Sequence, residues 1–361
     1  MVTLGFSLYP EQHSLEDSKA YMRLLHKYGA KRLFMSFLQL SPTDQSVFSL
    51  YRELVAYANR LGIKVIADIS PEFLEQTGWK TSLIKNAHDF GLAGVRLDEA
   101  LPLNEMIALS NNPYGIKIEL NMSTDDKLLT ALLHGCANRE NIIGCHNFYP
   151  HEFTGLSLEH FKKMSQCYHD MGIETAAFIS AQSATEGPWP LSEGLPTVED
   201  YRHLPLNLQV EMMKALGTID NLLLSNQFIS EEELKECSIA VSRKDMTLKI
   251  KPLVELTDVE KNIIDFEHVY RGDISSYVVR STMPRLAYAD ESIAARDQSK
   301  VVKRGSIIID NDAYKRYKGE LQIALKSFTI SPKANLVAEI DQAYLPLLDQ
   351  LKPWQSFRLE R

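Results

Sequence analysis

The chain has 361 residues, of which 45% are hydrophobic. This is more than one ordinary domain needs and enough for a large core, so we expect two domains or one barrel with an appendage. The formal net charge of -8 argues against a general attraction to nucleic acid or to an anionic membrane surface. An anionic ligand would therefore have to meet a local cluster of basic residues.

The compartment is indicated by the cysteines and by the first residues. No cysteine belongs to a CxxC pair or to a spacing typical of zinc sites, which predicts a reduced, cytoplasmic protein. The residues after Met1 lack a basic segment followed by a long apolar stretch, and no later apolar run approaches membrane-spanning length. We therefore expect neither export nor membrane insertion. The cysteines are Cys136, Cys145, Cys167 and Cys237.

Short apolar runs that end in polar or acidic residues alternate with helical segments through the first two thirds of the chain. Three helical segments, 14–29, 46–62 and 157–172, each end in a glycine suited to a left-handed helix cap. Eight strand–helix units favour an α/β fold, a TIM-like (β/α)8 barrel over residues 1–242. The alternative is a doubly wound sheet, although no GxGxxG follows the first strand. The strands are expected near 2–8, 32–37, 64–69, 94–98, 116–121, 142–147, 174–180 and 219–225.

The pattern changes after about residue 243. Short β segments separated by turns follow, without a convincing long helix before residue 341. We expect a small antiparallel β domain, barrel-like, over residues 243–361. The junction near 238–246 is polar but not rich in glycine or proline, which favours a fixed interface over a loose tether.

Three carboxylates at strand ends are the candidate catalytic residues: Asp68, Asp98 and Glu119. In a parallel barrel the chemistry lies at the C-terminal ends of the strands, so these side chains should converge on one mouth. Neighbouring carboxylates repel one another, and the usual resolution is that one keeps its proton and can serve as an acid. The alternative for Asp98 is a structural ion pair with Arg96 that plugs the barrel.

A divalent metal is the other way to bring carboxylates together. Glu119, Asp98, His146 and His203 could supply ligands, but no HxH, HxxE or HExxH spacing is present. We therefore expect neither a metal nor another cofactor.

Polar and aromatic residues near the same strand ends are candidates for binding the substrate, because sugar faces pack well on aromatic rings. The loop over residues 180–205 is long, and such loops at a barrel mouth are often functional. Two residues have plain alternatives: His146 as a buried structural histidine, and His203 as an exposed bystander. The substrate-binding candidates are Tyr9, Glu11, Arg96, Asn121, His146, Asn147, Tyr149, Trp189 and His203.

The second domain has a cluster of arginines and hydroxyl groups within residues 269–285. Guanidinium groups with hydroxyls match the oxygens of a phosphate monoester or a carboxylate. The alternative is a solvated or interdomain face of ion pairs. The members of the cluster are Arg271, Arg280, Ser281, Thr282 and Arg285.

Several long motifs carry a family resemblance that spans essentially the whole chain. HNFYPHEFTGLS (146–157), GFSLYPEQ (5–12), RST.PR (280–285) and NDAYKRYKGELQI (311–323) resemble the MupG-like 6-phospho-N-acetylmuramidases. These bacterial proteins were long catalogued as being of unknown function or labelled outer surface proteins. The chain departs from the usual string at HEF (151–153), which affects the loop contacts there.

The resemblance implies a TIM-like barrel followed by a cyclophilin-like β-barrel. It also implies a cytoplasmic glycosidase of peptidoglycan recycling, which cleaves N-acetylmuramic acid 6-phosphate from N-acetylglucosamine in a disaccharide phosphorylated during uptake. The only partner expected is this small molecule, with no nucleic acid and no membrane. Its phosphate and lactyl carboxylate would account for an arginine cluster on an acidic protein.

Glycoside hydrolysis needs a proton donor and a second carboxylate, which attacks, activates water or orients the 2-acetamido group. Our hypothesis makes Glu119 the general acid and Asp98 its partner, while Asp68 holds hydroxyls or the acetamido N–H; exchanged roles stay open, as do retention and inversion. Two other classes also stay open: a metal-dependent sugar-phosphate isomerase or aldolase on the same barrel, and a non-catalytic surface or binding protein.

Overall fold

The computed structural model describes residues 2–38, 40, 45–97, 99, 101–124, 127–184, 186–188 and 193–361. Two of the predicted site residues, Asp98 and Trp189, lie outside these ranges. The chain forms two compact units, Met1–Ser242 and Arg243–Arg361. Each unit is described by itself.

The first unit is a closed barrel of eight parallel strands in sequential order, in which β1 pairs with β8. Every predicted strand is present, so the TIM-like barrel is confirmed and the open doubly wound sheet was the wrong alternative. The strands are β1 (Thr3–Leu8), β2 (Ala30–Ser36), β3 (Lys64–Ile69), β4 (Gly94–Leu97), β5 (Lys117–Asn121), β6 (Ile142–Cys145), β7 (Glu174–Ile179) and β8 (Asn221–Leu224).

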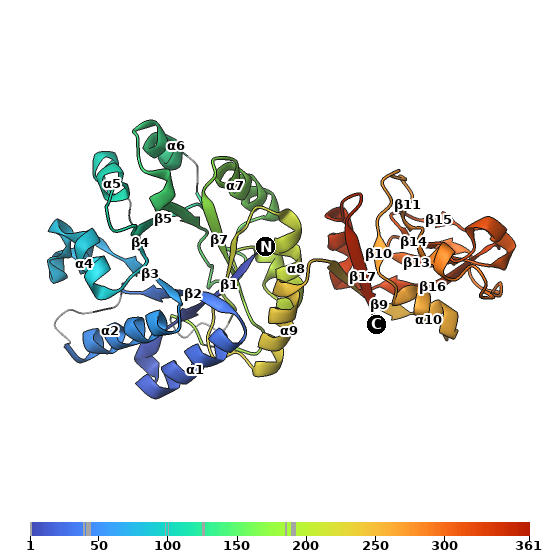
Figure 1. Cartoon of the computed structure of the whole chain (residues 1–361), viewed down its shortest axis with the longest axis horizontal. Coiled ribbons are helices and arrows are strands. Elements are labelled where there is room, and N and C mark those ends of the chain that lie inside the picture. Colours follow the sequence, from blue (N-terminus) through green and yellow to red (C-terminus); the bar gives the residue numbers. More distant parts are fainter. Residues whose placement is uncertain are drawn as a thin grey trace. The chain divides into compact units, whose positions relative to one another are not determined.

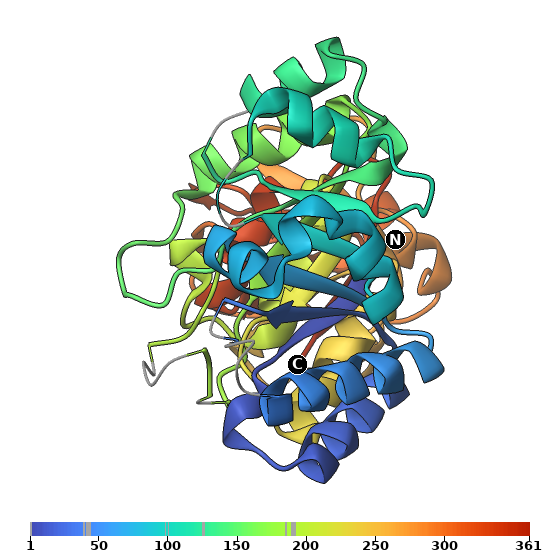
Figure 2. The ribbon, with the colours of Figure 1, turned by 90° about the vertical axis from the view of Figure 1, so that its left-hand side faces the viewer.

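Helices lie outside this ring of strands, as Figures 1 and 2 show. They are α1 (Leu15–Lys27), α2 (Gln45–Arg60), α3 (Pro71–Thr77), α4 (Leu83–Phe90), α5 (Leu103–Ser110), α6 (Lys127–His134), α7 (Leu158–Asp170), α8 (Leu206–Leu216) and α9 (Glu231–Ser242). Short 3-10 helices are η1 (Pro10–Gln12), η2 (Trp79–Thr81), η3 (Arg139–Asn141) and η4 (Glu199–Tyr201).

The ends of these helices follow from the local sequence. Ser14 and Ser157 cap α1 and α7, because each side-chain hydroxyl accepts a hydrogen bond from the backbone N–H three residues later. Gly29, Gly62 and Gly172 have φ angles of 89°, 73° and 70°. Only glycine adopts these angles without strain, so the three predicted glycine stops are confirmed.

The interior of the barrel is apolar toward one side and charged toward another. Successive strand residues point to opposite faces, so every second residue of a strand faces the interior. An apolar cluster consists of Phe34, Cys145, Ala176, Phe178 and Leu223. Four charged residues, Arg32, Asp68, Arg96 and Glu119, are also buried, each with at most 7% of its surface exposed. Burying charged side chains costs desolvation free energy, so these four residues are unlike the rest of the apolar barrel core.

The second unit is a seven-stranded sheet in the order β10-β17-β9-β16-β13-β14-β11, with a small additional pair of β12 and β15. Its elements are β9 (Met246–Pro252), α10 (Asp258–Ile264), β10 (His268–Val269), β11 (Val278–Ser281), α11 (Pro284–Ala287), β12 (Val301–Val302), β13 (Ser306–Asp310), η5 (Asp312–Tyr317), β14 (Leu321–Ala324), β15 (Phe328–Thr329), β16 (Ala334–Ile340), η6 (Gln342–Asp349) and β17 (Ser356–Glu360).

This sheet is nearly closed, and it is mixed rather than antiparallel. The edge strands β10 and β11 come together where the Arg271 N–H donates to the Arg280 carbonyl at 3.0 Å. Strand β17 runs parallel to β9, with Phe357 opposite Met246. The expectation of a purely antiparallel domain was therefore wrong, because a parallel pairing between distant segments leaves no local trace in the sequence.

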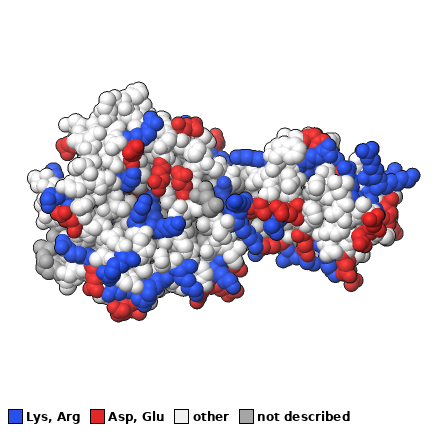
Figure 3. Space-filling view, in the orientation of Figure 1, with Lys and Arg blue, Asp and Glu red and all other residues white. Residues whose placement is uncertain are grey.

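The face of the first unit shown in Figure 3 carries lysine and arginine interspersed with aspartate and glutamate. None of the described helices is long and apolar enough to cross a membrane.

Candidate active site

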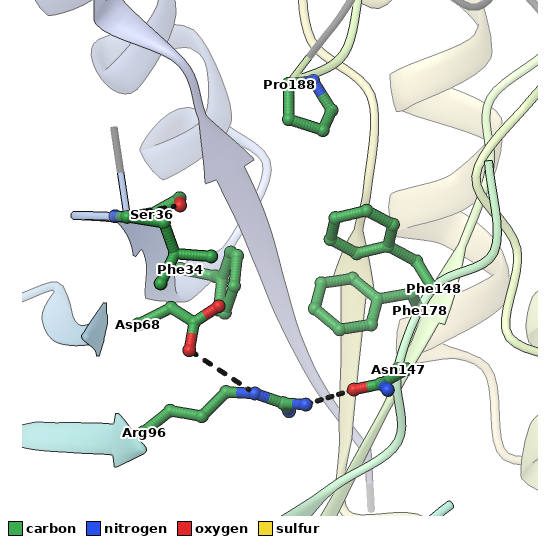
Figure 4. Close-up of a pocket in the computed structure, with 9 residues that line it drawn as sticks. Phe34, Ser36, Asp68, Arg96, Asn147, Phe148, Phe178 and Pro188 are labelled. Carbon is green, nitrogen blue, oxygen red and sulfur yellow. Dashed lines mark hydrogen bonds and ion pairs between the residues drawn. The ribbon is translucent and has the colours of Figure 1, made fainter. Parts of the chain in front are cut away.

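A cavity of about 170 Å³ opens at the C-terminal ends of strands β2, β3, β4 and β7 (Figure 4). This volume is below the range of about 300–1,000 Å³ that is usual for a whole ligand, so the described part accommodates one chemical group of a larger molecule. Its walls are polar on one side and aromatic on the other. The lining residues are Phe34, Ser36, Leu38, Asp68, Arg96, Asn147, Phe148, Phe178 and Pro188.

The polar side consists of Asp68, Arg96 and Asn147. Arg96 Nε lies 3.6 Å from Asp68 Oδ1, and another N–H of the same guanidinium donates to Asn147 Oδ1. Arg96 also donates to the Cys145 carbonyl at 3.3 Å. The guanidinium is therefore held by groups from the ends of two strands, β3 and β6, and its ion-pair partner Asp68 lines the cavity.

The aromatic side consists of Phe34, Phe148 and Phe178, whose rings meet edge to face. The ring centroids are 5.3 Å apart for Phe34 and Phe178 and 5.1 Å apart for Phe148 and Phe178. Figure 4 shows Phe148 and Phe178 facing Asp68 across the cavity, with Pro188 at its outer end. An apolar wall opposite an ion pair suits a ligand group that is apolar at one end and polar at the other.

Glu119 lies beneath the cavity and is not part of its lining. Only 1% of its surface is exposed, and it forms an ion pair with Arg32 Nη2; Arg96 Nη1 lies 3.9 Å from its other oxygen. Both carboxylate oxygens of Glu119 lie next to guanidinium groups and the residue does not line the cavity, whereas a general acid must reach the bond that is cleaved. This geometry disagrees with the general-acid role expected for Glu119. Strand tilt is the reason, since the in-register residues Asp68, Arg96 and Glu119 lie at successively greater depths.

His146 belongs to the layer between the barrel and helix α7, and not to the cavity. Its ring nitrogens lie 3.2 Å from Ser123 Oγ and 3.0 Å from Ser165 Oγ, and its ring packs on Phe161. Burial, together with the nearby His160 and Arg96, lowers the pKa of His146 to about 3. The substrate-binding expectation for His146 therefore does not fit, and its structural alternative does: Asn147 faces the barrel, so its neighbour faces outward.

Two candidates after β1 also have partners of their own. The Tyr9 hydroxyl donates to the Ser225 carbonyl at 2.7 Å, and its ring is buried; this burial raises the pKa of Tyr9 above its ordinary value. Glu11 accepts a hydrogen bond from the Tyr51 hydroxyl. Neither Tyr9 nor Glu11 lines the described cavity.

The remaining barrel candidates also lie away from the cavity. Asn121 Oδ1 accepts from the Ser123 N–H at 2.9 Å and so shapes the turn after β5. Tyr149 is tied through its backbone, its N–H donating to the Pro196 carbonyl at 3.0 Å. The His203 side chain is 73% exposed and lies 3.0 Å from Glu152, as the bystander alternative expects. Of the predicted substrate-binding residues, the structure brings Arg96 and Asn147 together with Asp68.

The arginines of the second unit are paired with carboxylates. Arg280 makes two hydrogen bonds to Glu320, at 2.7 and 3.2 Å, and Arg285 lies 3.5 Å from the same carboxylate. Arg271 pairs with Asp273. These contacts match the ion-pair alternative, and a phosphate would have to compete with the carboxylates for the guanidinium groups.

The hydroxyl residues of that cluster do not both share its surface. Ser281 is fully buried, and its hydroxyl lies 2.9 Å from His268 Nδ1 in the core. Thr282 is partly buried directly after β11. The buried position of Ser281 disagrees with its expected role as a phosphate ligand. The reason is again strand alternation, which sends Ser281 to the face opposite Arg280.

Sequence reasoning missed most of the apolar lining and the cation beneath it. Strand β2 contributes the alternate residues Arg32, Phe34 and Ser36, and β7 contributes Phe178. Strand alternation places these side chains in the barrel interior, but it does not say how deep in the barrel each one lies. Leu38 and Pro188 carried no local signal. Among the residues that the structure describes, no three His, Cys, Asp or Glu side chains are grouped to hold a metal ion.

The fold and this cavity define a barrel protein with an enzyme-like site: a charged carboxylate, fixed by arginine, at the mouth where barrel enzymes carry out their chemistry. Two family models then match nearly the whole chain: "6-phospho-N-acetylmuramidase, N-terminal" over residues 4–239 and "6-phospho-N-acetylmuramidase, C-terminal" over residues 246–360. The chain belongs to the 6-phospho-N-acetylmuramidase family, and it is therefore a glycosidase. The expected resemblance is confirmed.

Two solved structures resemble the chain over its full length. One is an uncharacterized Bacillus cereus protein, with 36% identity, a TM-score of 0.89 and complete coverage of both chains. The other is a conserved protein of unknown function from Enterococcus faecalis, with 24% identity and a TM-score of 0.76, covering 99% of this chain and 96% of that one. No curated protein matches the chain.

Proposed function

We propose that this glycosidase cleaves the bond between N-acetylmuramic acid 6-phosphate and N-acetylglucosamine in a disaccharide derived from peptidoglycan. The family supplies the reaction and implies a phosphorylated sugar as substrate. The observation that carries the proposal further is the cavity that combines Asp68 with an aromatic wall.

The 2-acetamido group of the muramic acid fits the described cavity in size and in polarity. Its methyl group would pack against Phe148 and Phe178, and its N–H would donate to Asp68. A lactyl carboxylate is a poorer fit, because Asp68 would repel it. We therefore place the acetamido group here, with the bond to be cleaved next to it.

Asp68 suits the role of the charged carboxylate in this reaction. Holding the acetamido N–H would aim the amide oxygen at the anomeric carbon and stabilise the positive charge that develops on the amide during bond cleavage. The reaction also needs a proton donor. Asp98, two residues after Arg96, stays a sequence-based candidate for it and lies outside the described residues, while Glu119 is the less suitable candidate because of its ion pair with Arg32.

The experiment incubates the purified protein with the phosphorylated disaccharide and identifies the products. Wild type should release the two monosaccharides, with chelator or without, and Asp68→Asn should lose at least about 100-fold in kcat, as for other electrostatic groups in active sites. Glu174→Gln, at the exposed N-terminal end of β7, serves as a control for the loss of a carboxylate away from the cavity. Near-normal turnover of Asp68→Asn would reject the assignment, and loss of activity on chelation would favour the metal-dependent alternative.

A substrate analogue tests the acetamido placement separately. Replacing the 2-acetamido group by hydroxyl should reduce kcat for wild type far more than for Asp68→Asn, because the variant no longer orients that group. NMR of the first-formed anomer would show retention if the acetamido oxygen attacks the anomeric carbon. An inverted product would exclude that attack, and water activation by a carboxylate would replace it.

The second unit and the compartment complete the proposal. A nearly closed, mixed barrel is compatible with the cyclophilin-like domain implied by the family resemblance. The arginines 271, 280 and 285 remain our candidates for the 6-phosphate, with their carboxylate partners as competitors. Four free cysteines and a phosphorylated substrate support action in the reducing cytoplasm.

A further inference from the structure

Arg32 lies in the floor of the barrel beneath the proposed site. It belongs to β2 and faces the interior together with Phe34 and Ser36, which line the cavity above it. Only 5% of its surface is exposed. The opposite residue in β1 is Gly5, where an added Cβ would lie 3.1 Å from the Arg32 Cβ and 2.5 Å from Leu223. The absence of a side chain at Gly5 therefore leaves room for the guanidinium stem.

Arg32 is the end of a chain of four alternating charges that leads up to the cavity. Arg32 pairs with Glu119, Arg96 lies 3.9 Å from Glu119, and Arg96 lies 3.6 Å from Asp68. Among the residues that the structure describes, the two cations and two anions of this buried set balance one another in charge. Because of this balance, a change at the bottom of the chain alters the charge that its top member experiences.

We infer that Arg32 is a positioning residue for the glycosidase reaction: by neutralising Glu119, it leaves Arg96 committed to Asp68 and Asn147 at the cavity. Without Arg32, Glu119 would compete with Asp68 for the same guanidinium. The inference rests on the proposed role of Asp68 as a charged carboxylate. It gives a function to a residue that does not line the described cavity.

The buried Arg32–Glu119 ion pair carries a cost in desolvation free energy. Nε and Nη1 of Arg32 have no hydrogen-bond partner among the described residues, and neither has Glu119 Oε1. Buried ion pairs with unfilled hydrogen-bonding groups are often no more stable than apolar residues of similar volume. Stability alone therefore does not explain the pair, whereas the electrostatics of the site does.

Two ionisable neighbours among the described residues do not titrate in the same range. Tyr9 and Cys145 both interact electrostatically with Asp68, and burial raises the pKa of each well above its ordinary value, so both stay neutral near pH 7. Asp98 follows β4 and lies outside the described residues. Variants at Arg32 and Glu119 therefore change this ion pair while Tyr9 and Cys145 stay neutral.

The test compares kcat and KM against pH for wild type, Arg32→Met, Glu119→Gln and the charge-balanced double variant. Arg32→Met should move the acid limb of the kcat profile upward by about one pH unit, because Asp68 loses part of its guanidinium partner. Glu119→Gln should move it in the opposite direction, since the negative charge that competes with Asp68 for Arg96 is then removed. The double variant should return near the wild-type position, with a melting temperature no lower than that of Arg32→Met.

A structural role alone predicts a different result: every variant loses the same fraction of activity at all pH values, with unshifted limbs, and that result would overturn the inference. If Arg32→Met does not fold, two other variants test the inference. It then predicts a downward shift of the acid limb in Glu119→Gln and an unshifted acid limb in Arg32→Lys, which keeps the positive charge. The proposed function fails separately, through an active Asp68→Asn. An inactive Asp68→Asn with unshifted limbs in the Arg32 and Glu119 variants would remove only the role of Arg32.

Discussion

The buried His146 predicts a marked loss of barrel stability in mild acid. Its pKa is about 3 in the folded chain, because of burial between Ser123, Ser165 and Phe161, against 6.5 for an ordinary histidine. Between these values the unfolded chain binds the extra proton, so the free energy of unfolding falls as the pH falls. The contribution is complete above about pH 6.5 and is lost progressively toward pH 3.

The size of the effect follows from the two pKa values. Each pH unit in that window costs about 1.4 kcal/mol, so lowering the pH from 7 to 5 should remove about 2 kcal/mol through this side chain alone. In His146→Gln the glutamine does not titrate, and that part of the pH dependence should disappear. The absolute stability of the variant at pH 7 does not matter, because the slope against pH is what is compared.

The assay is urea unfolding followed by tryptophan fluorescence at several pH values, in a Trp354→Phe background. The two remaining tryptophans, Trp79 and Trp189, then both belong to the first unit. His169→Asn, at an exposed position of α7, is the matched control for the loss of an imidazole. Parallel lines for wild type and His146→Gln between pH 7 and 5 would refute the reasoning.

Two further predictions concern the second unit. Burial and the neighbouring Glu320 raise the pKa of Asp310 to about 7. The contribution of its protonated form to the free energy of unfolding is therefore fully present below pH 3.8, the ordinary pKa, and is lost as the pH rises through about 7. Asp310→Asn should therefore stabilise the unit by a few kcal/mol at pH 8 and not at pH 3.5, as measured by urea unfolding in a background without Trp79 and Trp189; an equal effect at both pH values would contradict this. Arg280→Ala should weaken kcat/KM for the 6-phosphorylated disaccharide far more than for its unphosphorylated analogue, with Arg304→Ala as control, and equal losses on both would remove Arg280 from the phosphate site.

The barrel could be predicted from the sequence because its evidence is local. Strand and helix periods alternate, Ser14 and Ser157 begin helices, and Gly29, Gly62 and Gly172 end them. These features depend on residues a few positions apart. The parallel pairing of β17 with β9 depends on residues far apart, so the mixed topology of the second unit could not be anticipated.

The lining of the candidate site could be predicted only in part, because strand alternation gives the face on which a side chain lies but not its depth in the barrel. Asp68, Arg96 and Asn147 were expected at the mouth and do line the cavity. Glu119 has the same strand-end pattern but lies deeper, because depth depends on how the strands tilt around the closed barrel. His146 was misplaced although strand alternation, applied strictly to its neighbour Asn147, would have turned it outward.

The pairing of β17 with β9 also constrains the order of events during synthesis. Residues of the first unit are complete once the ribosome has passed Ser242, so the barrel can fold while the rest of the chain is still being made. Strand β9 is made next, yet one of its two neighbours in the sheet is β17, at residues 356–360. Until β17 emerges, β9 exposes an open edge to other nascent chains. The edge of β9 is therefore covered, and protected from aggregation, only after β17 has been synthesised.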